Sequence, residues 1–551
     1  MKLKLNSNLF ESIFLIVVFF TLLLAGVGVL WDHKISHEFP YSYLASDAFQ
    51  DLDIAQNVKD SGNYRYYSIS GGIGNKDVVG QYVPILFTLP VLFSYSSGLE
   101  VYDSIYLMMF LLSSFGSIMM YLLIRKFNKS VAILSLPLSL FLFNGPFYVA
   151  FTWGQWGYLL GSYFLIAAVW AITKLEIKYS FILLGVILSG NFHAHPSEAM
   201  YIAGFGFVYL FFNSLMDKKI NLKAIKNYLY SIILFVIISF NYIIIFKNTF
   251  FKGNTGGKLV DLANPTSFGW KPLFLSSFDF LYILIIIGVL ISLFFIKKKN
   301  LAGILLGWFM LVVGYTNYLG GTLGSRSMQS RFFWPIYLGV FVGLLFYVLL
   351  KFVFKKRIFL YSILVSLALL IAIFNLYTDR FTTPGIMNQY NWESLDWIKK
   401  NAGAESKILF FYSDVYTHNS PVRQTNKSNF LVKGDYDFYE FLMQNRSIKR
   451  KFTVRPEGES SNSLPKRLSF FKFEERTAPF GEYDICKFNY FVLDILPQSS
   501  RQPYLIQANN IVRSYILDND IGKEVFNNQV VSVIKNEQFE KDCLPENGVK
   551  F

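Results

Sequence analysis

The sequence is poor in charged residues and in cysteine. Charged residues make up 16% of its 551 residues, whereas ordinary soluble proteins hold about 25%. A deficit of this size over so long a chain excludes a soluble enzyme, a disordered protein and a fibrous protein. The two cysteines, Cys486 and Cys543, are too few for a disulfide framework. One bridge and two separate thiols therefore remain equally consistent with the sequence.

The chain is rich in apolar residues, which make up 53% of it. They form runs of about 20 residues, the length of a helix that crosses a bilayer. Because lipid offers no hydrogen bonds to the backbone, such runs must be helical. We expect a polytopic α-helical membrane protein with eleven transmembrane helices. Their predicted ranges are 9–30, 103–124, 131–149, 156–173, 180–194, 198–216, 228–246, 279–296, 301–316, 332–350 and 358–377.

Basic residues gather in every second gap between these helices. Those gaps hold 18 Lys and Arg against three acids, whereas the rest of the membrane half holds 10 basic and 12 acidic residues. Positively charged loops stay in the cytoplasm. We therefore expect a multi-pass protein of the plasma membrane with a cytoplasmic N-terminus and a C-terminus outside. The net charge of +14 is explained by this topology, which leaves no basic patch for nucleic acid.

The first outer loop, about residues 31–102, is the longest. Within it the segment 46–67 reads SDAFQDLDIAQNVKDSGNYRYY, which predicts a short helix capped by Ser46 or Asp47 and stopped by its Ser-Gly pair. The later segment Tyr82–Ser97 is apolar, but it is short and holds two prolines. If it crossed the membrane, every later basic loop would lie outside. We expect it to lie on the outer surface or to re-enter from it.

The acids of this short helix are the candidate catalytic groups. Asp47 and Asp51 are one turn apart and share a face, whereas Asp53 lies roughly 200° from Asp51 and points elsewhere. Neighbouring carboxylates raise each other's pKa, which suits a general base at working pH. The pair Asp51 and Asp53 can clamp a metal only if the segment is extended. A solvated surface helix without a catalytic role is the alternative.

A histidine pair lies at the outer junction of the fifth and sixth helices, in the segment NFHAHPSE. His193, His195 and Glu198 are metal-ligand types, but the spacing of the histidines and the intervening proline disfavour a metal site. Hydrogen bonding to a polar ligand, or a satisfied helix junction, is the stronger interpretation. We expect no obligatory cofactor. A divalent metal held by Asp51, Asp53 and Glu198 is left open.

Two arginines lie in a glycine-rich outer loop, where positive charge is otherwise sparse. Arg326 and Arg331 lie in the loop GGTLGSRSMQSRFFWP, and Lys271 lies in the outer loop 247–277. Arginine suits bidentate binding of a phosphate. Snorkelling of these arginines to lipid head groups is the alternative. The sequence thus predicts an anionic ligand at the outer face.

Residues 1–377 form the membrane part, and residues 378–551 are polar enough to fold in water. Helical and strand patterns alternate in this tail, which predicts a small extracytoplasmic α/β domain. We expect helices at 391–403, 437–445 and 504–517, strands at 407–414 and 490–495, and a hairpin at 524–536. The tail has no nucleophile elbow, P-loop or metal cluster, so its expected role is docking, acceptor binding or stabilisation.

The layout resembles the GT-C superfamily of membrane glycosyltransferases, which use polyprenyl-phosphate-linked sugars. In that family a catalytic Asp opens the first outer loop, as Asp47 does here, and a Tyr-Pro-rich surface segment follows, as at Tyr82. A late outer loop carries an Arg-Phe pair, matched by Arg331 and Phe332. The outer domain then opens with a Trp-rich helix, matched by residues 392–397.

Two departures distinguish the chain from oligosaccharyltransferase catalytic subunits of that superfamily. Those subunits carry an acidic motif in the second outer loop, which here reads FTWGQWG from Phe151, without an acid. They also carry a Trp-Trp-Asp-Tyr-Gly motif in the outer domain, where this chain reads FFYSDVYT from Phe410. The resemblance therefore favours transfer of a single sugar, without an obligatory metal, over transfer of a glycan to asparagine.

The implied reaction moves a sugar, with inversion, from a polyprenyl phosphate to a hydroxyl of a glycan, lipid or protein. Asp47, helped by Asp51, would take the acceptor proton, and the leaving phosphate would be held by arginine. The residues expected to bind substrate are Arg331, Arg326, His193, His195, Tyr82 and Lys271. A transporter or flippase is the rival, but such proteins place ionisable groups near the membrane midplane. A non-catalytic scaffold and oligosaccharyltransferase-like glycan transfer also stay open.

Overall fold

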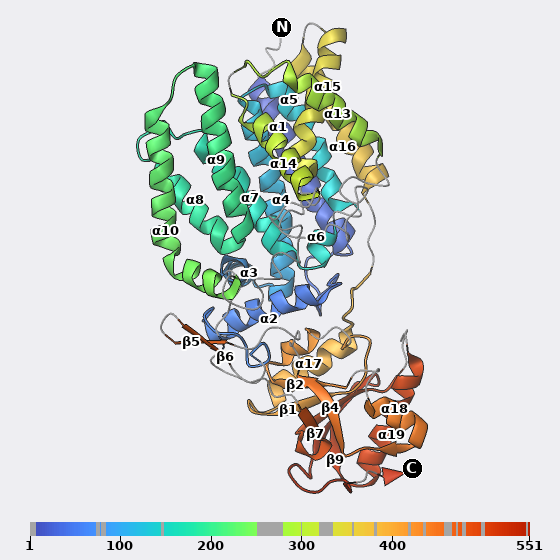
Figure 1. The fold of residues 1–551 in the computed structure, drawn as a ribbon. Coiled ribbons are helices and arrows are strands. Elements are labelled where there is room, and N and C mark those ends of the chain that lie inside the picture. Colours follow the sequence, from blue (N-terminus) through green and yellow to red (C-terminus); the bar gives the residue numbers. More distant parts are fainter. Residues whose placement is uncertain are drawn as a thin grey trace.

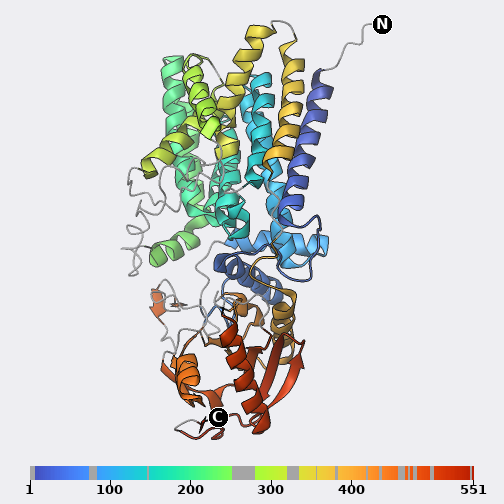
Figure 2. The ribbon, with the colours of Figure 1, turned by 90° about the vertical axis from the view of Figure 1, so that its right-hand side faces the viewer.

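The computed structural model combines a bundle of membrane helices with a C-terminal sheet domain (Figure 1). It describes residues 7–72, 78, 84–144, 148–250, 279–298, 300–318, 334–354, 357–378, 383–416, 420–432, 437–456, 466–469, 472–475, 481–496, 502–546 and 549–550. The first turn of α1 lies at the end of the bundle remote from the sheet domain (Figures 1 and 2).

All eleven predicted membrane spans correspond to helices. Six of the helices in the described ranges are individually long and apolar enough to cross a membrane, and the others are shorter. The bundle consists of α1 (Ser7–Leu30), α4 (Val101–Arg125), α5 (Lys129–Ser135) continued by the 3₁₀-helix η1 (Leu136–Phe143), α7 (Trp156–Ile172), α8 (Ser180–Ala194), α9 (Pro196–Asp217), α10 (Leu222–Phe250), α13 (Asp279–Leu293), α14 (Ala302–Tyr318), α15 (Trp334–Val353) and α16 (Ile358–Tyr377). The expectation of a polytopic α-helical membrane protein is confirmed.

The third span differs from its predicted range, 131–149. The α-helix stops at Ser135 because Pro137, in the first turn of η1, cannot donate a backbone hydrogen bond. The chain continues as a 3₁₀-helix to Phe143, and a separate short helix, α6 (Val149–Thr152), follows. Since a 3₁₀-helix rises about 2.0 Å per residue against about 1.5 Å in an α-helix, the combined segment still covers about 26 Å.

Two helices of the long loop between α1 and α4, which the charge pattern predicts to be the first outer loop, close one end of the bundle. Helix α2 (Ser46–Ser61) crosses this end between the bundle and the sheet domain, and α3 (Pro84–Ser97) lies beside it (Figures 1 and 2). The apolar segment Tyr82–Ser97 was predicted to lie at a surface rather than to cross the membrane. From Pro84 onward the segment forms a helix of 14 residues at the end of the bundle, and its tyrosine at position 82 lies outside the described residues.

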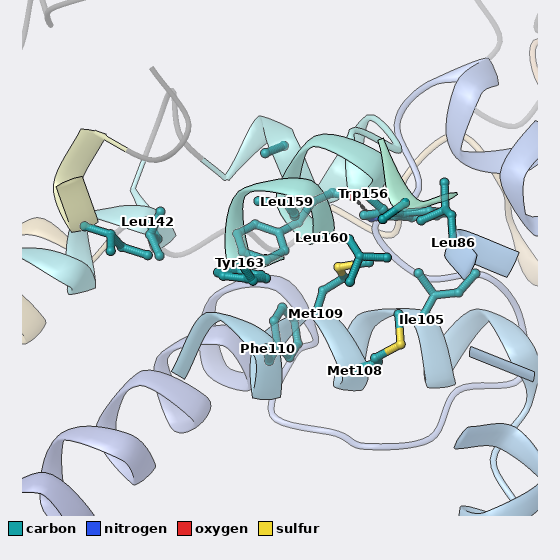
Figure 3. Close-up of a cluster of buried hydrophobic side chains, with 14 of the residues drawn as sticks. Leu86, Ile105, Met108, Met109, Phe110, Leu142, Trp156, Leu159, Leu160 and Tyr163 are labelled. Atoms are coloured by element: carbon teal, nitrogen blue, oxygen red, sulfur yellow. Dashed lines mark hydrogen bonds between the residues drawn. The ribbon is translucent and has the colours of Figure 1, made fainter. Parts of the chain in front are cut away.

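Aromatic and aliphatic side chains fill the bundle beneath these helices. Figure 3 shows Met109 and Phe110 of α4 facing Leu160 and Tyr163 of α7, with Leu86 of α3 at the edge. Phe110 is fully buried, and the other four are 6% exposed or less. This packing ties α3 and α7 to α4, so the base on which α2 rests is rigid.

The tail is an α/β domain, as predicted. Its main sheet has seven strands, of which the central three are parallel and the flanking pairs antiparallel. In spatial order the strands are β7 (Gly481–Asp484), β4 (Lys451–Pro456), β2 (Ser428–Leu431), β1 (Lys407–Phe410), β8 (Tyr490–Asp494), β10 (Val531–Asn536) and β9 (Gly522–Asn527). The helices are α17 (Gln389–Asn401), α18 (Asp437–Asn445) and α19 (Pro503–Asp518), with the 3₁₀-helices η4 (Pro421–Thr425) and η5 (Ile485–Lys487). Two small sheets pair β3 (Ser447–Ile448) with β11 (Val549–Lys550) and β5 (Lys466–Ser469) with β6 (Lys472–Glu475).

One apolar core continues from the bundle into the tail. It includes Phe49 of α2 together with Leu395 of α17 and Val492 of β8. The polypeptide also pairs with itself across the junction, where Ile386 N donates to the carbonyl oxygen of Tyr43 at 2.9 Å. The tail is therefore packed against the first outer loop.

A second apolar core lies within the sheet domain, around Phe411 and Phe491. A disulfide between Cys486 and Cys543 closes the edge of this core. The sequence left the pairing of these cysteines open, and the structure joins them.

Candidate functional site

The candidate site is built on α2, whose two ends are capped in different ways. Its C-terminus is a left-handed Gly62, whose N–H donates to the carbonyl of Val58 at 2.9 Å, as the predicted stop requires. The predicted cap at Ser46 or Asp47 is wrong. The N-cap is the extended Ala45, which makes no side-chain cap bond, so both polar residues fall in the first turn of the helix.

Asp47 and Asp51 lie on one face of α2, as predicted for a helix. Asp47 is exposed in the first turn, where the positive end of the helix dipole favours a carboxylate. Asp51 is only 8% exposed. Burial, reinforced by the negative charge of Asp47, raises the pKa of Asp51 well above its usual value. One exposed carboxyl group thus lies on the same face as a buried one whose pKa is raised.

The second outer loop fixes the first turn of α2 from the bundle side. The N–H of Leu44 donates to the carbonyl of Thr152 at 2.8 Å. Gly154 has a φ of +75°, and a Cβ on it would lie 2.5 Å from the backbone nitrogen of Ala48 and 2.8 Å from the carbonyl carbon of Asp47. Only glycine allows this approach, so the FTWGQWG loop sets where Asp47 stands.

Asp53 points away from the other two acids, as predicted. Its Oδ2 accepts a hydrogen bond from Ser68 Oγ at 2.8 Å. Burial raises the pKa of Asp53 to about 6, although the charge of Arg423 and the bond from Ser68 act in the opposite direction. Because the segment is helical, Asp51 and Asp53 face different neighbours and do not form a two-carboxylate clamp.

The helix junction between α8 and α9 separates the two histidines. His195 Nδ1 pairs with Glu198 Oε2, and its ring lies 4.1 Å, centroid to centroid, from that of Tyr158 on α7. Gly157 backs the same ring, since an added Cβ would lie 3.4 Å from His195 Cδ2. His195 therefore contacts the WGQWG segment at Gly157, three residues after the Gly154 that touches the first turn of α2.

His193 has different neighbours. Its Nδ1 donates to the carbonyl of Ser189 at 2.9 Å, and its ring lies 5.2 Å from that of Tyr242 on α10. The two histidines therefore do not share a site, and only His195 adjoins the segment that reaches α2. Glu198 is the partner of His195 rather than of the aspartates, and the described ranges hold no group of three His, Cys, Asp or Glu that could bind a metal ion.

The remaining predicted residues, Tyr82, Lys271, Arg326 and Arg331, lie outside the described residues, so their roles stay predictions. The structure adds residues that the sequence did not single out. Gly154 carried a signal, because a glycine between two tryptophans, with a second glycine directly after them, indicates close packing. Gln424 and Arg423 of η4, which face α2 from the tail, carried none.

The fold is similar to that of an Archaeoglobus fulgidus oligosaccharyltransferase, solved while tethered through a disulfide bond to an acceptor peptide containing the NVT sequon. The match has a TM-score of 0.51 and 10% sequence identity, and it covers 98% of this chain and 76% of that chain. No protein-family model matches the chain, and no curated protein matches it in sequence. At this identity the likeness shows the fold alone, and it confirms the expected architecture of a membrane helix bundle with a C-terminal α/β domain.

Proposed function

We propose that this protein is an integral membrane glycosyltransferase that moves a sugar from a polyprenyl-phosphate donor to an acceptor hydroxyl at the outer face. The observation that carries the proposal is the pair Asp47 and Asp51, one exposed and one buried, on the helix that closes the end of the bundle. The GT-C-like fold supports it at the level of architecture.

In the proposed reaction Asp47 is the general base. It takes the proton of the acceptor hydroxyl while the hydroxyl oxygen bonds to the anomeric carbon, and the bond from that carbon to the phosphate oxygen breaks. The phosphate leaves with the electron pair of the broken bond. Because the reaction is a single displacement, the anomeric centre inverts. Burial raises the pKa of Asp51 well above its usual value, and the proposed role of this residue is to donate a hydrogen bond to the sugar or to Asp47. His195, held by Glu198 beside the WGQWG loop, is the proposed contact with the acceptor.

Positive charge must meet the departing phosphate, because negative charge grows on it in the transition state. Arg331 and Arg326 are the proposed groups, with Lys271 as a third. The proposal needs no metal for this step.

Transfer of an oligosaccharide is the second candidate. The match with the archaeal oligosaccharyltransferase covers 98% of this chain, which favours this alternative. The second outer loop argues against it, because residues 151–157 contain no acid.

A panel of radiolabelled polyprenyl phosphosugars, incubated with the purified protein and with simple hydroxyl acceptors, tests the function. We expect one monosaccharide donor to be turned over. Turnover only of lipid-linked oligosaccharides with a peptide acceptor would support the second candidate. No turnover of either kind, together with transport of the lipid in vesicles, would favour a flippase.

A further inference from the structure

We propose that the C-terminal domain positions the catalytic helix, with Gln424 of η4 as the main positioning residue. This inference rests on the proposed function, because it concerns how Asp47 and Asp51 are presented. No motif in the domain indicates a specific role, and the contacts between η4 and α2 supply one.

The tail contacts α2 near both ends. Gln424 Nε2 donates to the carbonyl of Phe49, which lies between the two acids in sequence, at 3.2 Å. At the other end Lys399 Nζ bonds to Asp60 Oδ2 at 2.6 Å. Gln424 is 6% exposed, so its bond is shielded from water, whereas the Lys399 pair is half-buried and contributes little. The buried amide is therefore the stronger of the two contacts.

The segment that follows α2 is held by the same part of the tail. Ile69 N donates to Asn426 Oδ1 at 3.0 Å, and Asn429 Nδ2 donates to Ser70 Oγ at 2.7 Å. Asn429 is 4% exposed. This segment carries Ser68, which bonds to Asp53. The tail therefore also supports the side of α2 that carries Asp53.

Arg423 of η4 adds an electrostatic interaction on the side of α2 that carries Asp53. The guanidinium of Arg423 lies near enough to the carboxyl of Asp53 to favour its ionised form. Arg423 is 8% exposed and Asp53 is 4% exposed. Because water screens two such buried groups only weakly, their attraction favours the orientation of α2 in which Asp53 lies toward Arg423.

Contacts from the bundle on one side and from the tail on the other fix the position of α2. Gly154 meets the first turn of α2 from the bundle, and η4 meets it from the tail. A helix is stiff, so a contact at Phe49 sets the direction of Asp47 and Asp51, one turn apart. A small rotation would turn the exposed carboxylate away from an acceptor, and misplacement of a base by about 1 Å can cost 10² in rate.

The test uses Gln424→Met, which keeps the volume of the side chain but removes the donor. Hydrogen exchange of the peptide covering residues 46–61 is measured together with kcat and KM in the full-length protein. We expect α2 to exchange about tenfold faster, kcat to fall about tenfold, and KM for the donor to stay within about twofold. Gln424→His, which retains an N–H donor, should recover part of both losses.

Lys400→Met is the matched control. It removes an exposed pair with Asp396 inside α17 that does not touch α2, and we expect it to change neither quantity. Unchanged exchange of α2 in Gln424→Met would overturn the proposal, as would faster exchange with unchanged kcat. Equal loosening of β1 and β8 would also overturn it, because the domain would then only be unstable.

Failure of the proposed function remains distinguishable. If Asp47→Asn keeps full turnover, the assignment of the base falls. The exchange of α2 in Gln424→Met would still report whether η4 holds the helix.

Discussion

At the scale of single residues, position on one helix gives chemically identical groups different properties. Asp47 is exposed, Asp51 is buried beside it, and Asp53 faces Ser68 and Arg423 on another side. The helical periodicity predicted that Asp47 and Asp51 share a face and that Asp53 points elsewhere, but it did not predict that Asp51 is buried. It could not predict that Arg423 would be the charge near Asp53, because 370 positions of chain separate the two residues.

Asp494 at the end of β8 offers a prediction of pH dependence. Burial raises the pKa of its carboxyl to about 7, although bonds from Ser413 and Asn391 act in the opposite direction. The folded protein therefore holds a proton that the unfolded chain releases near pH 4. Stability from this group is complete below that pH, falls as the pH rises toward 7, and is lost above it.

We expect Asp494→Asn to remove this slope, because its amide oxygen can still accept the bond that Asn391 Nδ2 now donates to Asp494 at 3.0 Å. The wild type should lose about 2–3 kcal/mol relative to the variant between pH 5 and pH 8. Thermal unfolding of both proteins in detergent at the two pH values measures this difference. Parallel pH profiles for the two proteins would show that Asp494 is ionised throughout.

At the scale of elements, the sequence was most informative where a pattern is local. Hydropathy located all eleven bundle helices, and the segment Tyr82–Ser97, which the sequence leaves out of the spans, forms a shorter helix at the end of the bundle. Pro137 shortened the third α-helix, which an average over apolar residues cannot detect. The separation of His193 from His195 also escaped prediction, because it depends on which neighbouring helices, α10 and α7, supply the aromatic contacts.

Contacts between elements left almost no trace in the sequence. The bond from Gln424 to Phe49 joins residues 375 positions apart, and no periodicity encodes it. The cap at Ala45 was missed for a related reason. Its extended backbone is set by the neighbouring loop, where Leu44 bonds to Thr152, rather than by a capping side chain.

Gly154→Ala tests the contact between the second outer loop and α2. The new methyl group would meet the α2 backbone at 2.5 Å, and the φ of +75° disfavours any side chain. We expect α2 to shift and turnover to fall at least about tenfold, since the base moves with it. Turnover and thermal stability are to be measured in the same preparation.

Gly62→Ala is the matched control for this substitution. Gly62 has a φ of +66° with nothing within 4 Å of an added Cβ, so the variant carries the backbone strain without the collision. We expect a modest loss of stability, about 1 kcal/mol, with turnover near that of the wild type. Equal effects of the two variants would contradict the role assigned to the contact.

At the scale of the whole molecule, the bundle, α2 and the tail form one continuous packed unit. The tail lies at the end of the bundle remote from the start of α1 (Figures 1 and 2). The charge distribution predicts which end faces the cytoplasm. A site on α2 can meet lipid-linked donors outside only if that orientation holds.

Cysteine labelling tests this orientation. The chain has only two cysteines, and because they are bonded to each other, neither native thiol reacts with the label. We expect a reagent that cannot cross membranes to modify Ser97→Cys, at the exposed end of α3, in intact cells. It should not modify Lys298→Cys, after α13, until the cells are opened. The reverse pattern would place α2 in the cytoplasm and remove the proposed donor from its reach.

The central claim is that Asp47 is the base of a sugar-transfer reaction. The most direct measurement is donor turnover in Asp47→Asn, Asp51→Asn and Asp53→Asn, with expression and thermal stability matched. We expect Asp47→Asn to lose a factor of about 10² or more while still binding the donor, since the base acts on the acceptor. Asp51→Asn should lose less, and Asp53→Asn least. Wild-type turnover in Asp47→Asn, or an inactive Asp53→Asn beside an active Asp47→Asn, would contradict this assignment.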